Sequence, residues 1–301
     1  MLWDALPTGL FLGGAPFNVS CHLRAAGIPA AMVSRIGNDR LGEEILRRAA
    51  RYGVATDLIQ VDDALPTGFV RVSLDASGTA DYEIIAPAAW DAIAAEAALM
   101  TRAAKARAIV FGSLAQRHAT SRATIERLWE SQAIKVFDVN LRAPFDDRDV
   151  VERSLHHSEV VKVSHTELAR LVEWFDLPAE PRDAAVALSD AFGCDTVCIT
   201  RAEHGAGLWH AGTWTEHPGF EVEVRDTVGA GDAFLSVLLA GLLGGGQPGS
   251  VLEHANLIGA YVATQFGAVP MDQGVVVPLD VRPVPAPSKV ATKGRARGRK
   301  R

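Results

Sequence analysis

Residues 225–234 read R-D-T-V-G-A-G-D-A-F, and an apolar run over 234–239 follows them. The glycines predict a tight turn that leads into a buried helix. The first turn of a helix has backbone N–H groups without intrahelical partners, at the positive end of the helix dipole. Gly229, Ala230 and Gly231 carry too little bulk to keep an anion away from those groups. The stretch therefore predicts a seat for a phosphate group.

Asp232 directly follows this turn. A carboxylate repels phosphate, so we interpret it as a base that takes a proton from a hydroxyl attacking the phosphorus atom. An anion seat with an adjacent base is the minimum equipment for phosphoryl transfer. The alternative is structural, because an aspartate in the first turn of a helix stabilises that helix by capping and by its charge alone. Asp226 and Thr227, which lead into the turn, make the string more specific than a bare G-x-G-D.

The rest of the chain alternates between two kinds of segment. Apolar, β-branched segments predict strands at 31–33, 108–111, 135–139, 160–163 and 196–200. Amphipathic segments predict helices at 41–52, with Asn38-Asp39 as the N-cap, 121–132 and 181–192. Strands that alternate with helices and are apolar throughout predict an α/β fold with a mostly parallel sheet covered on both faces. Residues 65–85 instead predict a β-hairpin with its turn at 75–78, which would serve as a lid over a pocket.

Two further polar clusters could bind a ligand rich in hydroxyl groups. Gly13 and Gly14 precede Pro16, which suits the first turn of a helix, and Asn18 offers a donor and an acceptor. A second cluster follows the strand at 135–139, where Asn140 could bind a sugar hydroxyl and Arg142 a phosphate or a substrate acid. The alternatives are a glycine turn before a helix for the first cluster, and turn residues with a surface ion pair for the second.

Two more strand ends carry groups suited to a nucleotide. Lys162 could contact a phosphate, and Glu167 could hold Mg²⁺ through a water molecule. Alternatively, Ser164 and Glu167 form a capping box at a helix start, and both roles are compatible. The turn from Thr200 to Gly205 is a weaker signal of the same kind.

Composition narrows the class of protein. The chain has 301 residues, and the tail 289–301 carries seven of its 30 basic residues and no acidic one, leaving 23 basic against 36 acidic residues elsewhere. An acidic body argues against a specific nucleic-acid partner, although the tail could bind nucleic acid weakly.

The longest apolar run, 234–243, is too short to cross a membrane. Three cysteines, Cys21, Cys194 and Cys198, predict free thiols in a cytoplasmic protein.

Nucleotide-binding motifs of other classes are absent from the sequence. No G-x4-G-K-[ST] occurs, and no G-x-G-x-x-G opens a βαβ unit. The sequence therefore argues against a P-loop enzyme and against a nicotinamide-binding fold.

The strings G-G-A-P-F-N-V-S (13–20), V-S-R-I-G-N-D-R-L-G (33–42) and D-T-V-G-A-G-D-A-F (226–234) resemble the PfkB, or ribokinase-like, carbohydrate kinase family. The resemblance runs from about Leu2 to about Pro270, and L-W-D-x-L-P near the start is most similar to the fructokinase branch. It implies a ribokinase-like α/β fold with a small β lid, and transfer of the γ-phosphoryl group of ATP, with Mg²⁺, to a sugar hydroxyl. It also implies a kinase domain over 1–277, followed at 278–301 by a Pro-rich and then basic tail that we expect to be extended and disordered.

The resemblance also implies roles for individual residues. Asp232 matches the catalytic base, and Gly229, Ala230 and Gly231 match the anion hole. The positions that match sugar-binding residues are Asp4, Gly14, Asn18 and Asn140, beside Gly13 and Arg142 above. The positions that match the nucleotide or metal side are Lys162, Glu167, Thr200, Gly205 and Asn256. Asp226 and Val228, with the loop around Gly267, match a monovalent cation site, which suggests K⁺. Family lids often pair, which implies a homodimer through the lid.

Three departures from the family pattern bear on activity. A first strand that members carry ahead of the equivalent of Leu2-Trp3-Asp4 is missing, Ala202 replaces the middle glycine of T-x-G-x-x-G, and N-x-x-E keeps only Glu167. The leading prediction is an ATP-dependent kinase acting on fructose. The alternatives are a kinase for another sugar or for a sugar acid such as 2-keto-3-deoxygluconate, and a catalytically weakened sugar-binding protein.

Overall fold

The computed structural model describes residues 1–6, 9–74, 80–270 and 282–283 of the chain. Its largest sheet has six strands in the order β12-β11-β10-β9-β8-β7. Strands β7 to β10 run parallel, and β11 and β12 are antiparallel to their neighbours. The strands are β7 (Ala108–Gly112), β8 (Ile134–Asp138), β9 (Val160–Ser164), β10 (Thr196–Thr200), β11 (Ala206–His210) and β12 (Thr213–His217). The four parallel strands confirm the predicted segments, whereas the β11–β12 hairpin was not predicted.

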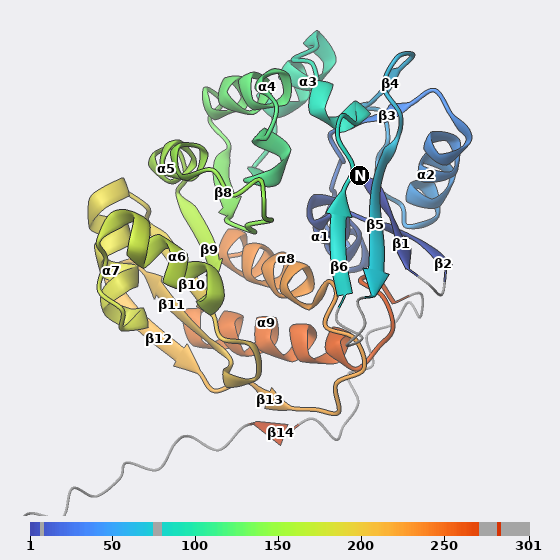
Figure 1. Cartoon of the computed structure of the whole chain (residues 1–301). Helices are drawn as coiled ribbons and strands as arrows, with labels where there is room; N and C mark the ends of the chain where they lie inside the picture. The colour runs from blue at the N-terminus through green and yellow to red at the C-terminus, as the bar shows by residue number, and fades with distance from the viewer. Residues whose placement is uncertain (7–8, 75–79, 271–281, 284–301) are drawn as a thin grey trace, which may run out of the picture.

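Helices cover both faces of this sheet, as the sequence predicts (Figure 1). On one face lie α4 (Ala119–Trp129), α5 (Arg148–His156), α6 (His165–Phe175) and α7 (Pro181–Phe192). On the other face lie α1 (Ala15–Ala25), α8 (Ala230–Leu243) and α9 (Pro248–Ala263). The second group includes the helix that begins at the glycine turn, so this face carries the candidate site.

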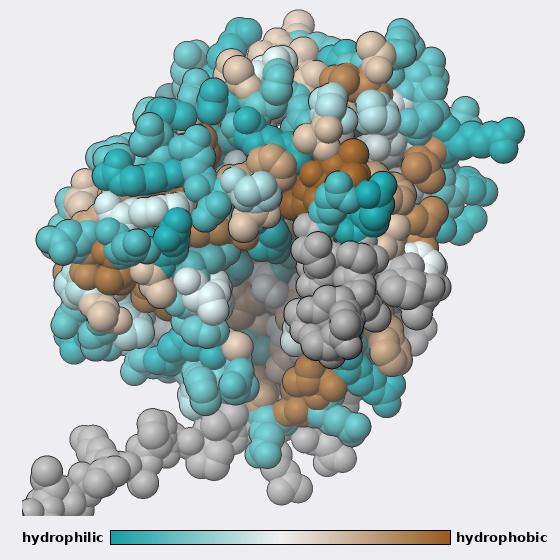
Figure 2. All heavy atoms as spheres, in the orientation of Figure 1, coloured by the Kyte–Doolittle hydropathy of each residue, from teal (hydrophilic) through white to brown (hydrophobic). Residues whose placement is uncertain are grey.

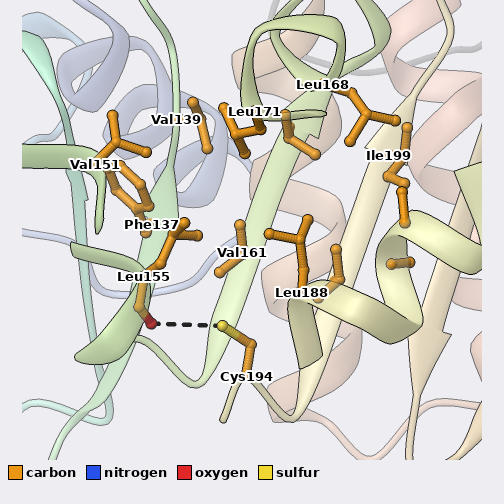
Figure 3. Close-up of a cluster of buried hydrophobic side chains, with 14 of the residues drawn as sticks. Phe137, Val139, Val151, Leu155, Val161, Leu168, Leu171, Leu188, Cys194 and Ile199 are labelled. Atoms are coloured by element: carbon orange, nitrogen blue, oxygen red, sulfur yellow. Dashed lines mark hydrogen bonds between the residues drawn. The ribbon is translucent and has the colours of Figure 1, made fainter. Parts of the chain in front are cut away.

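The alternation of side chains along the parallel strands builds one core on each face. Phe137 and Val161 point toward α5 and α7, where they pack with Leu155 and Leu188 (Figure 3). Their neighbours in sequence, Val136 and Val160 among them, pack against α8 and α9 instead. Full burial of such a side chain stabilises the fold by about 1.5–3 kcal/mol. A strand buried on both faces must be apolar throughout, which is why these segments were readable in the sequence.

A second sheet of four strands forms the lid, in the order β2-β1-β5-β6. Strand β1 pairs antiparallel with β2 and parallel with β5, and β5 pairs antiparallel with β6. The predicted hairpin is therefore present, while its turn at 75–79 lies outside the described residues. The strands are β1 (Leu2–Leu6), β2 (Gly9–Gly13), β5 (Gly68–Leu74) and β6 (Ala80–Ile84).

The remaining elements connect the two sheets or border them. Strands β3 (Ser34–Gly37) and β4 (Ile59–Asp62) form a parallel pair. The strand predicted at 31–33 is misplaced, because Ala31 makes only an isolated bridge to Ala55 and the regular strand begins at Ser34.

The predicted cap of α2 (Arg40–Arg51) is confirmed, since Gly42 N donates to Asp39 Oδ1 at 2.8 Å. Also present are α3 (Ala97–Ala103), the 3₁₀ turns η1 (Ala89–Ala92), η2 (Leu114–Gln116) and η3 (Ala202–His204), and β13 (Phe220–Glu221) paired with β14 (Arg282–Pro283).

The face of the molecule in Figure 2 is mainly hydrophilic, with hydrophobic residues in scattered patches. Within the described residues, no helix combines the length and the apolar character needed to span a membrane. Apart from β14, the Pro-rich and basic segment predicted at 278–301 lies outside the described residues.

Candidate active site

The predicted anion seat is a glycine turn at the start of α8. Gly229 is the N-cap residue and has a φ of 79°, a conformation that favours glycine. A side chain on Gly229 would also collide with Ala268, so the position requires glycine for two reasons. At Gly231, the position of a Cβ would lie 3.3 Å from Lys162 Nζ. A lysine ammonium therefore lies beside this helix start, where Ala230 N donates to Thr227 O at 3.2 Å. The ammonium and the positive end of the helix dipole both favour an anion.

Asp232 lies in the first turn of α8 and is held by α1. Asn18 Nδ2 donates a 2.8 Å hydrogen bond to Asp232 Oδ2, across 214 residues of sequence. Asn18 is only 4% exposed, and its Oδ1 has no hydrogen-bond partner among the described residues. A buried amide oxygen without a donor is costly, so this site suits a ligand that brings a hydroxyl group.

Lys162 on β9 forms a buried ion pair with Asp138 at the end of β8, with 3.0 Å between Nζ and Oδ1. Burial alone would lower the pKa of Lys162, but the charges of Asp138 and Glu167 raise it above its usual value. The lysine therefore stays charged at neutral pH. A positive charge fixed in this way can stabilise negative charge that develops above it.

The pKa of Asp232 is raised to about 7. Burial is the largest cause, and repulsion from Asp138 adds to it, while the hydrogen bond from Asn18 and the charge of Lys162 act in the opposite direction. A carboxylate with this pKa can take up a proton and release it near neutral pH, which is the property that a general base requires.

Two of the predicted sugar-binding residues, Asp4 and Gly13, lie on the paired lid strands β1 and β2. The pKa of Asp4 on β1 is raised to about 6, mainly by burial, while the charge of Arg142 opposes the shift. A side chain on Gly13 would collide with Asp4 Oδ2, and one on Gly14 would lie 3.5 Å from Met1 Cα. Gly13 thus allows β1 and β2 to approach one another closely, whereas Gly14 is favoured by its φ of 109°.

Asn140 lies in the loop after β8 and has a φ of 41°, a left-handed conformation that asparagine tolerates. Ser113 Oγ donates to Val139 O at 2.7 Å, and Leu141 N donates to Glu167 Oε1 at 2.9 Å. These two contacts fix the loop on either side of Asn140. Arg142 follows, and its Nη1 donates to Leu141 O at 2.8 Å.

Glu167 has the capping role that the sequence left open. Its Oε2 accepts from Ser164 N at 2.8 Å, and its own N donates to Ser164 Oγ at 3.3 Å, so the two form a capping box on α6. Among the described residues, no group of three or more His, Cys, Asp or Glu side chains could hold a metal ion. Mg²⁺ usually keeps several waters and binds through substrate phosphates and one or two carboxylates, so Glu167 fits such an ion only through water.

The other positions predicted to bind nucleotide lie on neighbouring elements. Thr200 pairs with Ser164 in the register of β10 and β9, which puts it at the same edge of the sheet as Glu167. Gly205 has a φ of 74°, and a side chain there would collide with His217 O. Asn256 on α9 is buried, and its Nδ2 donates to Leu252 O at 2.7 Å.

The two loops predicted to hold a monovalent cation are in contact. Asp226 Oδ1 accepts from Val228 N at 3.0 Å, and its Oδ2 accepts from Gly267 N at 2.9 Å. The carboxylate of Asp226 thus joins the loop before α8 to the loop after α9.

Taken together, the structure brings Asp232, Asn18 and Lys162 to the start of α8. Thr200 and Gly205 lie further along the sheet, beyond Lys162. Sequence reasoning missed Asp138 as the partner of Lys162 and Ser113 as the support of Asn140. Both are polar residues at the ends of apolar strands, which is the signal that could have found them.

Comparisons with known proteins bear on the family of the chain and on its fold. The sequence matches the pfkB family carbohydrate kinase over residues 8–273. A fructokinase of Klebsiella pneumoniae is 28% identical over 271 residues, which cover 85% of this chain and 87% of that protein. A 2-dehydro-3-deoxygalactonokinase of Haloferax volcanii is 27% identical over 288 residues, which cover 90% of this chain and 86% of that protein.

Among solved structures, a fructokinase from Xylella fastidiosa with bound ATP is similar, with a TM-score of 0.79 and 25% sequence identity. The similarity covers 89% of this chain and 90% of that one. The ribokinase-like fold and the family resemblance predicted from the sequence are thereby confirmed.

Proposed function

Because this chain belongs to the pfkB family of carbohydrate kinases, we propose that it transfers the γ-phosphoryl group of ATP to a hydroxyl of fructose, with Asp232 as the general base. The observation that carries this proposal is the carboxylate of Asp232, held by Asn18 at the start of α8, with its pKa raised to about 7. A carboxylate with an ordinary pKa would be a weaker base at neutral pH.

In the proposed reaction, Asp232 takes the proton of the attacking hydroxyl. The sugar oxygen forms a bond to the γ-phosphorus as the bond from that phosphorus to the bridging oxygen breaks, and ADP leaves with the electron pair. The N–H groups at Gly229 and Gly231 and the ammonium of Lys162 stabilise the charge on the transferred group, and the N–H of Ala230 does so if it exchanges Thr227 O for the phosphate. Mg²⁺, held by phosphate oxygens and through water near Glu167, would supply further positive charge.

The sugar is proposed to lie between α1 and the lid. The unpartnered Oδ1 of Asn18 accepts a sugar hydroxyl, and the carboxylate of Asp4 accepts another. Asn140 contributes from the loop that Ser113 and Glu167 hold in place. Thr200, Gly205 and Asn256 are proposed to line the nucleotide side, and Asp226 and Val228 a K⁺ site.

A second candidate is a kinase for a sugar acid. The observation that favours it is Arg142, whose described hydrogen bond is to a backbone carbonyl and whose charge reaches Asp4 and Asp232. The similarity to the 2-dehydro-3-deoxygalactonokinase of Haloferax volcanii points in the same direction. A guanidinium that binds a substrate carboxylate is worth about 1.5–3 kcal/mol per charged hydrogen bond.

Release of ADP from Mg-ATP, measured with fructose, ribose, tagatose and 2-keto-3-deoxygluconate, tests the proposal. We expect turnover with fructose, and little change in it when Arg142 is replaced by glutamine. Preferred turnover of the keto acid, lost at least about tenfold in Arg142→Gln, would assign the second function instead. Sugar binding without turnover of any sugar would contradict both and indicate a sugar-binding protein.

The lid is proposed to pair with the lid of a second copy. Strand β2 is at the edge of the lid sheet, and Leu10 and Phe11 on it are 44% and 41% exposed. An edge strand with exposed apolar side chains favours association with another chain. Light scattering should give the mass of a dimer, and Leu10→Lys should reduce it to that of a monomer; a monomeric unsubstituted chain would contradict the pairing.

A further inference from the structure

Arg117 is a buried cation near the point where the lid rejoins the rest of the chain. It directly follows the turn η2, and its side chain is 5% exposed. Its Nε and Nη2 donate to the two carboxylate oxygens of Asp91 in η1, at 2.7 and 2.8 Å. A paired contact of this kind fixes the plane of the guanidinium as well as its position. Asp91 is itself held in place, because its Oδ2 also accepts from Ala88 N at 2.9 Å.

The same guanidinium holds the exit of the β5–β6 hairpin. Strand β6 ends at Ile84, and Arg117 Nη2 donates to the carbonyl oxygen of the next residue, Ile85, at 2.9 Å. The N–H of Ile85 donates to Phe69 O on β5 at 3.0 Å. Ile85 therefore gives one hydrogen bond to the lid and receives one from Arg117, so that the guanidinium is tied directly to the lid sheet.

The guanidinium of Arg117 also contacts the loop after β8. Its Cζ lies 4.7 Å from the ring centre of Phe145 in this loop and 3.9 Å from that of Trp90 in η1. A cation placed over the face of an aromatic ring is attracted to that ring. Phe145 N donates to Arg142 O at 2.8 Å, which closes the turn that begins at Arg142. Arg117 is therefore in contact with the loop that carries Asn140 and Arg142, two of the candidate sugar-side residues.

The entry of the β5–β6 hairpin is held by a different side chain. Thr67 directly precedes β5, and Asp39 accepts from it twice, from Thr67 N to Oδ2 at 2.9 Å and from Thr67 Oγ1 to Oδ1 at 2.8 Å. Asp39 is the N-cap of α2. The contacts of Asp39 thus join the lid to α2, whereas those of Arg117 join it to the loop of Asn140.

We propose that Arg117 is a positioning residue that fixes the distance between the lid and the loop of Asn140, so that both sides of the sugar site approach the substrate together. Asp4 lies on β1, which pairs with β5 and so belongs to the lid side. Asn140 and Arg142 belong to the loop side. Arg117 itself contacts neither sugar nor ATP in this proposal. The consequence for the sugar rests on the proposed function, whereas the connection between lid and loop does not.

A double substitution removes the connection without stranding a buried charge. Arg117→Ala alone leaves Asp91 buried without its partner, which destabilises a fold whatever else the arginine does. Arg117→Met combined with Asp91→Asn removes both charges. Methionine keeps an apolar chain in place of the arginine stem, and asparagine keeps an oxygen that accepts from Ala88 N. The hydrogen bond to Ile85 O is lost.

Lys135→Met combined with Glu159→Gln is the matched control, since it makes the same chemical change at another ion pair. Lys135 Nζ lies 2.9 Å from Glu159 Oε1. Lys135 is near the beginning of β8, whereas Asp138, beside the candidate site, is at its end. The control therefore loses an ion pair away from the lid and from the loop of Asn140.

Hydrogen exchange without any substrate tests the connection itself. In the double variant at 91 and 117, we expect the backbone amides at 83–85 and at 140–142 to exchange more than about tenfold faster, because both segments lose a common anchor. Exchange at 196–200 in β10 should stay unchanged, and the control should not accelerate 83–85 or 140–142. Unchanged exchange in either segment, or equal acceleration in β10, would overturn the proposal.

Steady-state kinetics with a sugar that the unsubstituted protein turns over tests the consequence. We expect the KM for the sugar to rise at least about tenfold in the double variant, and the KM for Mg-ATP to stay within about twofold. A purely structural role would reduce the amount of active protein, and so the apparent kcat, with an unchanged KM for the sugar; that result would refute positioning by Arg117. If no sugar is turned over, the proposed reaction fails, while hydrogen exchange still decides whether Arg117 connects the lid to the loop.

Discussion

At the scale of single residues, the site depends on one carboxylate whose environment opposes its charge. Asp232 is partly buried near the charge of Asp138, and the hydrogen bond that it accepts from Asn18 does not compensate for burial. Its position at the start of a helix could be predicted from the glycine turn before it, and its role as a base stays a prediction beside the alternative of helix capping. Its pKa could not be predicted, because Asp138 and Lys162 reach it from strands far away in the sequence.

The raised pKa of Asp232 predicts the pH dependence of turnover. The base acts when it is ionised, so kcat/KM should rise with pH up to about 7 and level off above that value. Steady-state rates between pH 5 and pH 9 at saturating Mg-ATP measure this directly. A profile that is flat from pH 5 upward would mean that the base has an ordinary pKa or that another group acts.

Ala202 has a left-handed backbone conformation, which is unfavourable for alanine. It has a φ of 50°, at the position where the family pattern has glycine. A non-glycine residue in this region costs about 1–2 kcal/mol. We expect Ala202→Gly to stabilise the protein by about 0.5–1 kcal/mol, since the more flexible unfolded chain offsets part of the gain.

The midpoint of thermal unfolding measures the effect of Ala202→Gly. Ala187→Gly is the matched control, because Ala187 lies within helix α7, where glycine should destabilise by about 1 kcal/mol. The two substitutions should therefore shift the midpoint in opposite directions. A loss of stability in Ala202→Gly would contradict the strain inferred from its backbone.

At the scale of elements, the sequence was informative where an element is either apolar throughout or strongly amphipathic. Strand β10 and helix α7 have the bounds that the pattern predicts, 196–200 and 181–192. The β11–β12 hairpin was missed, because its residues mix polar and apolar types without clear alternation and Gly212 is its main turn signal. The strand at 31–33 was misplaced because its apolar residues line a cavity beside β7 instead of pairing regularly.

Glu167, at the start of helix α6, connects this helix to the loop of the candidate site. Glu167 caps this helix and also binds Leu141 N in the loop of Asn140. In Glu167→Gln, one accepting oxygen becomes an NH₂ group that faces a backbone N–H, so we expect stability to fall by about 1–3 kcal/mol. If Glu167 also holds Mg²⁺ through water, the Mg²⁺ concentration for half-maximal turnover should rise several-fold.

Thermal unfolding and a Mg²⁺ titration of turnover measure these two effects separately. Glu173→Gln serves as the control, since Glu173 is an exposed residue of the same helix. Lower stability with an unchanged Mg²⁺ requirement would leave Glu167 a structural residue and contradict its role at the metal.

At the scale of the whole molecule, the ribokinase-like fold could be predicted from the glycine-containing strings before α1 and α8. What no motif predicts is the cavity of about 740 Å³ that the described residues leave between β7 and residues 28–33.

The arrangement of the two sheets explains how the site is assembled. Asp232 and Asn18 come from helices on one face of the large sheet, Lys162 and Asp138 from its strands, and Asp4 from the lid. The residues meet because parallel strands end at a common edge. If Asp4 binds the sugar as proposed, the sugar side of the site is complete only with the lid in position.

Turnover of the Asp232→Asn variant tests the central claim most directly. Asparagine keeps an oxygen that accepts from Asn18 but cannot take a proton, so we expect turnover with Mg-ATP and fructose to fall by about 10²–10⁴-fold. Fructose binding, measured by calorimetry, should stay within a few-fold, and Asp190→Asn, on the exposed side of α7, should leave turnover unchanged. A variant at Asp232 that keeps more than about a tenth of the turnover would contradict its assignment as the base.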